Sequence, residues 1–399
     1  NITVNHYEVG TTTQLYSPTP GGTPSAQNFN GTGKLGLSEN ITNKEADIAN
    51  YEYVNVDVAG AAGASTPNTA NGATTVTYVA GNQVVNYYYR RKNAANITVH
   101  HYEVGTTDEL FTPTGASSPS AVVIDGSGRL GQTENLNNEA ANIANYEYVS
   151  VDVSGASSAT TPSSTGATTV TNGSTPQTVI YYYRRKNAGN ITVNHYEVGG
   201  STQLYTPSGS TTPSAQNFDG TNKLGLSENL TNKAADIANY EYVGVDTTGA
   251  SSATTPSATG DTTLTYGSTP QTVTYKYRRK NAGSVKVFYI DGDSGVNLAE
   301  PKILDGNKKL GLAYTTEPEN IEFHDLISMP ANASGVITSS PQTVTYTYRR
   351  KNGGNVKVFY VDEESGEDLV TPKVIEGAGK LGLPYTTDVE TIENLDLIS

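Results

Sequence analysis

Four segments of this 399-residue chain end in tyrosines that are followed at once by two arginines, a lysine and an asparagine. Aromatic rings beside guanidinium groups can stack on a sugar ring or hold an anionic group such as a carboxylate or a sulfate. We therefore predict these endings as candidate ligand-binding sites. The residues concerned are Tyr88, Arg90, Tyr182, Arg184, Arg278 and Arg349.

The same endings also have a structural interpretation, which we favour. Residues 87–89 read as a strand, so one face of this run belongs in a core. Residues 90–92 would then leave that core as a solvated exit and would pair with acidic neighbours such as Glu8 or Asp57. These endings lie at every domain boundary, and a tandem array needs uniform geometry at its boundaries.

The histidines offer little support for catalysis or metal binding. His6, His101 and His195 recur at one position of a repeated segment, where later copies have Tyr289 and Tyr360. A ring that packs is therefore enough at this position. No repeat adds a Cys or a further His at the spacing of a zinc site, and no Gly-x-Ser-x-Gly elbow or phosphate loop is present. We predict that the chain is not an enzyme and needs no cofactor.

Two acidic turns, 291–295 and 362–366, bring several carboxylates together, as calcium loops do. Neither has the spacing of a twelve-residue calcium loop, and Asp and Gly are common in hairpin turns. We favour a solvated turn and keep calcium at the contacts between domains as the alternative. Lys286 and Lys357 could suggest a Lys–Asn cross-link, but the first three repeats have Thr there, so a solvent-facing lysine is the better interpretation.

Composition excludes some classes of partner. The chain has no Cys, no Trp and one Met, and its formal net charge is −14. A chain without cysteine tolerates an oxidising exterior, and a strongly acidic chain does not favour nucleic acid. We therefore expect an extracellular protein with no nucleic-acid partner and no membrane insertion within this sequence.

Internal repetition decides the organisation of the chain. NITVNHYEVG at Asn1 returns as NITVHHYEVG at Asn96 and as NITVNHYEVG at Asn190, a period of roughly 95 residues that is long enough for a small domain with its own core. The sequence predicts domains at 1–92, 96–186, 190–280 and 284–351, and a partial one at 355–399. Connectors such as 93–95 are too short for much independent swing, so we expect an elongated, semi-rigid, monomeric rod. The incomplete fifth repeat indicates a fragment of a longer protein.

Each repeat reads mostly as strand. Ile2, Val4 and His6 alternate with more polar residues, and residues 51–57 and 83–89 show the same period of two. The only helical pattern covers residues 42–50, where Thr42 and Glu45 have the spacing of a capping box. Stretches rich in Gly, Ala, Ser and Thr, such as 154–166, predict mobile surface loops. The fold class is β-dominated, α+β at most.

The last two repeats resemble a known family. VKVFYVDEESGEDLVTPKVIEGAGKLGLPYTT at 356–387, together with PQTVTYTYRRK at 341–351, is similar to the mucin-binding protein repeat, the MucBP domain of Gram-positive surface proteins. The first three repeats depart from this pattern, with Glu8 in place of Asp291 and with the Ser/Thr-rich insertion, and look like divergent members. The resemblance implies a β-grasp, ubiquitin-like fold in each repeat.

The resemblance also implies a function. It suggests the repeat region of an adhesin anchored in the cell wall of a Gram-positive bacterium, with mucin or another host or environmental glycoprotein as partner. The alternative is a passive stalk that projects a separate ligand-binding tip domain and has no ligand of its own. The two differ in one observable, because the isolated repeats of an adhesin bind mucin and those of a stalk do not.

Overall fold

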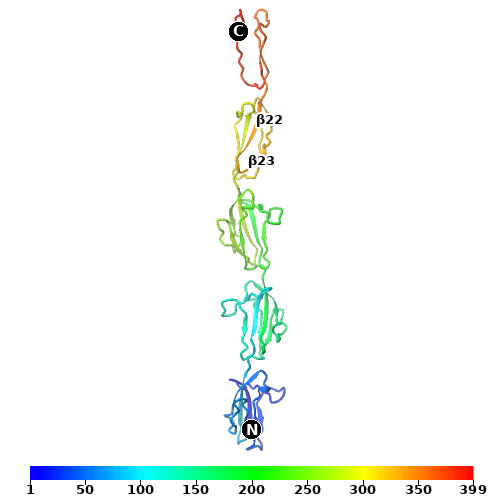
Figure 1. Ribbon diagram of the computed structural model, residues 1–399, viewed down its shortest axis with the longest axis vertical. Coiled ribbons are helices and arrows are strands. Elements are labelled where there is room, and N and C mark those ends of the chain that lie inside the picture. Colours follow the sequence, from blue (N-terminus) through cyan, green and yellow to red (C-terminus); the bar gives the residue numbers. More distant parts are fainter. Residues whose placement is uncertain (399) are drawn as a thin grey trace. The chain divides into compact units, whose positions relative to one another are not determined.

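The computed structural model describes residues 1–398. It divides into two units, one of Asn1–Ala188 with Thr221–Gly225 and one of Gly189–Gly220 with the chain from Leu226 onward. The first four repeats are built alike, with β-strands as almost all of their regular structure, and Figure 1 shows the repeats in the order of the chain from blue to red. We describe the repeats by their strands.

The first repeat sets the pattern for the others. It contains β1 (Ile2–Glu8), β2 (Gln27–Phe29), β3 (Ser38–Ile41), η1 (Glu45–Asp47), β4 (Tyr51–Asp57), β5 (Thr74–Thr77) and β6 (Gln83–Arg91). The second repeat contains β7 (Ile97–Glu103), β8 (Val122–Ile124), β9 (Thr133–Leu136), β10 (Tyr146–Asp152), β11 (Thr168–Thr171) and β12 (Gln177–Arg185).

The later repeats follow the same order. The third contains β13 (Ile191–Glu197), β14 (Gln216–Phe218), β15 (Ser227–Leu230), β16 (Tyr240–Asp246), β17 (Thr262–Thr265) and β18 (Gln271–Arg279). The fourth contains β19 (Val285–Asp291), β20 (Lys302–Leu304), β21 (Ala313–Thr315), β22 (His324–Ser328), β23 (Ser334–Val336) and β24 (Gln342–Arg350), of which β22 and β23 are labelled in Figure 1. The fifth contains β25 (Val356–Val358) and β26 (Lys373–Ile375).

A four-stranded mixed sheet forms the body of each of the first four repeats. In the first repeat its order is β2-β1-β6-β4, with β1 and β6 parallel and each flanked by an antiparallel strand. A second, two-stranded sheet pairs β3 with β5. The parallel centre arises because the first and last strands of the repeat lie side by side in full register, from Ile2 opposite Gln83 to Glu8 opposite Tyr89.

The core lies on one face of this sheet. Alternate residues of β1 and β6, among them Ile2, Val4, Val85, Tyr87 and Tyr89, have no exposed surface. Full burial of one such side chain contributes roughly 1.5–3 kcal/mol. The buried tyrosines also keep hydroxyl partners, since Tyr87 donates to the carbonyl oxygen of Gly72 at 2.9 Å. The strand pattern predicted from alternation is confirmed.

The predicted helix at residues 42–50 is wrong. Only the 3-10 turn η1 forms there, and the described residues contain no α-helix. The capping box does not form, because Asn43 accepts the hydrogen bond from the backbone N–H of Glu45 at 2.9 Å and the Glu45 side chain instead accepts one from the N–H of Tyr53 at 3.2 Å. Asn50, at φ 68°, then closes the segment after about one turn. The regular structure is therefore almost entirely β. Within residues 1–398 no helix is long and apolar enough to cross a membrane.

The Gly/Ala/Ser/Thr-rich stretch at 154–166 is hydrogen-bonded to the repeat along its length. Ser158 Oγ donates to the carbonyl oxygen of Thr171 at 2.8 Å, and the carbonyl oxygen of Gly166 accepts from the buried Tyr181 hydroxyl at 3.0 Å. Ala156 is buried. The stretch expected as a mobile loop thus packs on the repeat through Ala156 and forms hydrogen bonds with it through Ser158 and Gly166.

Candidate functional site

The outward face of the central sheet carries the predicted tyrosines. Because side chains alternate along a strand, burial of Tyr87 and Tyr89 in the core turns Tyr88 outward. Its ring lies 6.3 Å from that of Tyr7, its partner in register on β1. In the second repeat Tyr182 lies opposite Tyr102 in the same way.

The third and fourth repeats replace this tyrosine. Lys276 takes the outward position on β18, with its Nζ 5.3 Å from the centre of the Tyr196 ring on β13. On β24 the position is Thr347, opposite Ile290. An aromatic ring from the first strand therefore remains in three repeats, and the fourth repeat has a different surface.

The predicted arginines lie where the last strand leaves the sheet, and all four are exposed. Arg90 forms an ion pair with Glu52, and the Nε atoms of Arg184 and Arg278 lie 2.5 Å from Glu147 and Glu241. Their side chains keep 57–70% of their surface exposed, so each pair stabilises the fold by less than about 1 kcal/mol. In the fourth repeat Arg349 lies opposite Asp325 in register.

The predicted acidic partners of residues 90–92 differ from those in the structure. Glu8 and Asp57 were predicted to pair with residues 90–92, but Arg90 pairs with Glu52, and Lys92 pairs with Glu45 at 3.4 Å. The reason is the strand order, because β4 places Glu52 directly opposite Arg90. The solvated exit itself is confirmed for Arg90, whereas Arg91 is half-buried.

A ladder of amide side chains continues the outward face beyond the tyrosines. Asn5 Nδ2 donates to Asn86 Oδ1 at 2.8 Å, and Gln14 Nε2 donates to Asn5 Oδ1 at 2.7 Å. The third repeat keeps the bond from Gln203 to Asn194, at 2.8 Å. Sequence reasoning missed these residues, although Asn and Gln at matching positions of repeats one and three were a readable signal.

The second repeat has an ionisable pair in place of the amides. His100 Nδ1 lies 2.6 Å from Glu109 Oε1 and 2.7 Å from the Tyr102 hydroxyl. The His100 ring also stacks on Tyr102 at 5.0 Å. Rings, carboxylates and guanidinium groups thus lie along the outward face of the first three repeats, with amide side chains among them in the first and third.

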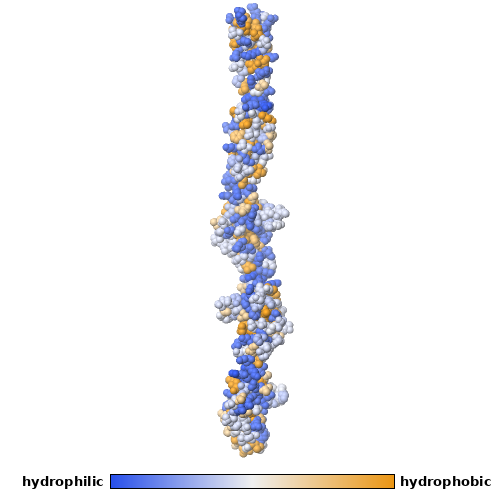
Figure 2. Space-filling view, viewed as in Figure 1, coloured by the Kyte–Doolittle hydropathy of each residue, from blue (hydrophilic) through white to orange (hydrophobic). Residues whose placement is uncertain are grey.

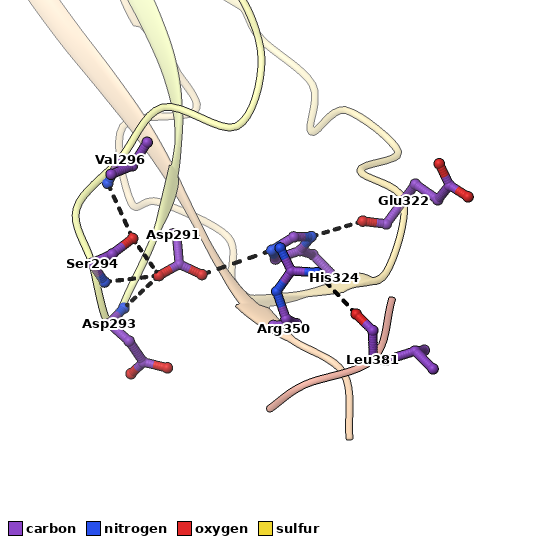
Figure 3. A network of polar contacts seen from close by, with 8 residues as sticks. All are labelled: Asp291, Asp293, Ser294, Val296, Glu322, His324, Arg350 and Leu381. Atoms are coloured by element: carbon purple, nitrogen blue, oxygen red, sulfur yellow. Dashed lines mark hydrogen bonds and ion pairs between the residues drawn. The ribbon is translucent and has the colours of Figure 1, made fainter. Parts of the chain in front are cut away.

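The acidic turn of the fourth repeat, shown in Figure 3, uses its carboxylate internally. Asp291 Oδ1 accepts hydrogen bonds from the backbone N–H and from the hydroxyl of Ser294, both at 2.8 Å, and these bonds lower the pKa of the Asp291 carboxyl. Its other oxygen lies 3.8 Å from His324 Nε2. Among residues 1–398 no group of three or more His, Cys, Asp or Glu side chains is arranged to hold a metal ion. The calcium alternative gains no support.

Comparison with known families identifies the repeats. The model of the MucBP domain matches residues 16–90, 97–184, 191–278, 284–349 and 355–399, which is most of the chain. The chain belongs to the MucBP domain family. The matches fall on every repeat, including the three that depart from the motif of the last two.

Curated relatives include internalin J from two strains of Listeria monocytogenes. Internalin J of serovar 1/2a is 35% identical over 178 residues, and internalin J of serotype 4b is 32% identical over 229 residues. These alignments cover 43% and 55% of this chain. The chain spans about a fifth of each relative, 19% and 21% of their lengths.

Solved structures with some likeness include Mub-RV and the type 2 repeat of the mucus binding protein MUB from Lactobacillus reuteri. Their sequence identities are 10% and 14%, and their TM-scores are 0.13 and 0.14. Each alignment covers 41% of this chain, with 99% and 100% of the solved chain. At TM-scores this low, neither adds to the fold described above.

The recurrent histidines are core residues of the MucBP repeats, as predicted. His6, His101 and His195 stack on Tyr87, Tyr181 and Tyr275 with ring centres 5.4–5.5 Å apart. In the fourth repeat Tyr289 stacks on Tyr346 at 5.7 Å. Burial lowers the pKa of His6 and of His101 to about 4 and lowers the pKa of His195.

The surface of the MucBP repeats is mixed in polarity. Figure 2 shows hydrophilic and intermediate residues over most of the visible face, with apolar residues scattered among them. Lys286 and Lys357 are both exposed, as a solvent-facing lysine requires. The aromatic and amide strip is therefore the feature that best distinguishes the first three repeats as candidate binding modules.

Proposed function

We propose that this chain is the repeat region of a bacterial cell-surface adhesin and that its first three MucBP repeats bind glycan chains of mucin or of another glycoprotein. The proposal places the chain outside the cell, on the wall of a Gram-positive bacterium, as a binding protein without enzymatic activity. It also retains the β-grasp assignment for each repeat.

The observation that carries this proposal is the outward strip of the central sheet. A sugar ring presents an apolar face and a rim of hydroxyl groups. Half-exposed rings such as Tyr7 and Tyr88 offer an apolar surface. The half-buried Asn86 amide beside them can both donate and accept hydrogen bonds, and the buried Asn5 holds it in place through a hydrogen bond of 2.8 Å. Arg90, at the end of the strip, adds a planar cation for a carboxylate or sulfate.

Family and relatives agree with this setting. The matching family is described as the MucBP domain, and the relatives are internalins of Listeria monocytogenes. A chain without cysteine suits an extracellular protein, and a net charge of −14 does not favour a nucleic-acid partner.

The experiment is binding of the whole chain to immobilised mucin over a salt series, with deglycosylated mucin as control. One variant combines Tyr7→Ala, Tyr102→Ala and Tyr196→Ala. A matched control removes exposed loop side chains from the same repeats through the combined substitutions Thr12→Ala, Thr107→Ala and Ser201→Ala.

Saturable binding that is lost on deglycosylation and in the tyrosine variant, but not in the loop variant, is the expected result. Tyr88→Ala combined with Tyr182→Ala should weaken binding in the same direction. Equal binding by all variants would remove the strip from consideration as the site.

A passive stalk is the second candidate, and the ion pairs of Arg90, Arg184 and Arg278 favour it because they give these side chains a partner inside their own repeat. Absence of saturable mucin binding by the unmodified chain would support this function. The ligand of the whole protein would then have to be sought outside this sequence.

A further inference from the structure

The second arginine of each ending behaves differently from the first. Arg91 Nη2 donates to the Tyr51 hydroxyl at 2.7 Å, and its guanidinium carbon lies 4.6 Å from the centre of that ring. Arg91 Nη1 donates to the carbonyl oxygen of Leu130, at 3.0 Å, which belongs to the second repeat. One planar fork thus connects a ring of its own repeat to the backbone of the next, an arrangement that the single ammonium group of a lysine would not reproduce.

The hydrogen bond from the second arginine to a leucine carbonyl oxygen recurs in every later ending. Each guanidinium donates through Nη1 to a leucine carbonyl 2.9–3.0 Å away, and the first two also donate through Nη2 to a tyrosine hydroxyl at 2.6 Å. The arginine and leucine pairs are Arg185 with Leu224 inside the first unit, and Arg279 with Leu310 and Arg350 with Leu381 inside the second, the last drawn in Figure 3.

Backbone bonds surround each of these contacts. The N–H of Leu130 donates to the carbonyl oxygen of Lys92 at 3.1 Å, and the N–H of Gly128 donates to Asn93 Oδ1 at 2.8 Å. Between the fourth and fifth repeats the N–H of Leu381 donates to the carbonyl oxygen of Lys351 at 3.0 Å. The acceptor loop has the sequence Gly-x-x-(Lys/Arg)-Leu-Gly, at 31–36, 126–131, 220–225, 306–311 and 377–382.

The last glycine of this loop lies close to a side chain of the preceding repeat. Gly131 has φ 78°, and a Cβ there would collide with the Asn50 side chain of the preceding repeat. Gly36, the equivalent glycine of the first repeat, has φ 80° and nothing within 4 Å of the same position. The later glycines repeat the collision. Gly225 faces Asn145, Gly311 faces Asn239, and Gly382 faces Phe323.

Within this sequence no ending contacts the equivalent loop of the first repeat, residues 31–36. There Leu35 is 75% exposed, whereas Leu130, Leu224, Leu310 and Leu381 are all half-buried. Docking therefore covers a leucine that the loop otherwise exposes, in addition to satisfying its carbonyl oxygen. Burial of apolar surface and formation of a charge-assisted hydrogen bond both favour the docked state.

We propose that the Gly-x-x-(Lys/Arg)-Leu-Gly loop is a docking site for the Arg-Arg-Lys-Asn ending of the adjacent repeat, and that Arg91 and its equivalents couple neighbouring repeats. The partner that this surface fits is a second copy of the repeat, presented by the same chain. This inference goes beyond the proposed function, because it holds both if the repeats bind a glycan and if they form a passive stalk.

Pulsed electron paramagnetic resonance on the full chain tests the coupling directly. The chain has no Cys, so nitroxide labels at Asn55→Cys and Val123→Cys, both exposed, report only the separation of the first two repeats. Arg91→Ala should at least double the width of the distance distribution. Arg90→Ala, which removes the neighbouring exposed arginine, should leave the width unchanged.

A second pair of variants keeps Arg91 and its contact with Tyr51 intact. Gly131→Ala brings a Cβ against Asn50 and should broaden the distribution, whereas Gly36→Ala imposes the same backbone strain away from the junction and should not. This pair decides the matter if Arg91→Ala unfolds the first repeat. An unchanged width in both Arg91→Ala and Gly131→Ala, or equal broadening by each variant and its control, would overturn the proposal.

Discussion

Acidification should loosen the first three repeats more than the fourth, because their recurrent histidine is buried as a neutral ring. His101 is the clearest case. Its side chain is 2% exposed, it stacks on Tyr181, and neither ring nitrogen has a hydrogen-bond partner within residues 1–398. Burial and the nearby His100 lower its pKa to about 4. A proton on this ring would place an uncompensated charge in the core.

The sign and size of the effect follow from linkage. A folded pKa of about 4 lies below the ordinary value of 6.5, so the unfolded chain binds the proton first. The contribution of His101 to stability is therefore fully present above pH 6.5 and is lost as the pH falls toward 4. Between pH 7.5 and pH 5 the loss is about 2 kcal/mol, or roughly 30-fold in the unfolding equilibrium.

Hydrogen exchange followed by mass spectrometry measures this repeat by repeat in the full chain. After correction for intrinsic exchange, the protection factor of β12 should fall roughly 30-fold relative to that of β24 between pH 7.5 and pH 5. The fourth repeat has Tyr289 at the histidine position and serves as the internal reference. Its buried His324 differs from His101 because a carboxylate oxygen of Asp291 lies 3.8 Å from the ring. At pH 5 most carboxylates remain ionised, which limits their contribution.

His101→Tyr provides the matched control, because the chain itself uses tyrosine at this position with the same stacked geometry. The variant should lose the selective fall of β12 while the first and third repeats keep theirs. Equal loss of protection in β12 and β24, or a fall that persists in the variant, would refute the role assigned to the buried ring.

Further substitutions probe the core and the exit within one repeat. Tyr181→Phe leaves the buried carbonyl oxygen of Gly166 without its donor and should cost about 1–3 kcal/mol in denaturant unfolding. Ile97→Ala empties a fully buried site and should cost about 2–5 kcal/mol, whereas truncation of the exposed Val149 should change stability by less than about 0.5 kcal/mol. Arg184→Ala should cost less than about 1 kcal/mol, since its pair with a glutamate is solvent-exposed; a larger loss would mean that the pair is structural.

Strand positions and the core were predictable from sequence because they depend on local alternation. Ile2, Val4 and His6 are buried as their spacing predicts, and replacement of the histidine by tyrosine in later repeats correctly indicated a packing role. That no helix forms at 42–50 was not predictable in the same way. The capping pattern of this segment is local, but only Ile48 anchors the segment in the core. Asn43 caps its first turn in place of Thr42, and Asn50 ends it after about one turn.

The site was predictable in part for the same physical reason. That Arg90 would be solvated follows from its place after a strand, but its partner depends on which strand lies beside β6, and that is a property of the sheet order. The contact of Arg91 with Leu130 joins two repeats, so no pattern within one repeat reveals it. Recurrence of Gly-x-x-(Lys/Arg)-Leu-Gly in all five repeats was the available signal.

Parallel pairing of the first and last strands has a mechanical consequence for each of the first four repeats. The chain enters at Ile2, beside Gln83, and leaves past Tyr89, beside Glu8, so the two ends of the pair point in opposite directions. Tension between entry and exit slides β1 against β6 and loads the bonds of their ladder together, in shear. An antiparallel terminal pair would instead open one bond at a time. Each of these four repeats is thus connected so that traction along the chain meets a set of hydrogen bonds that must break together.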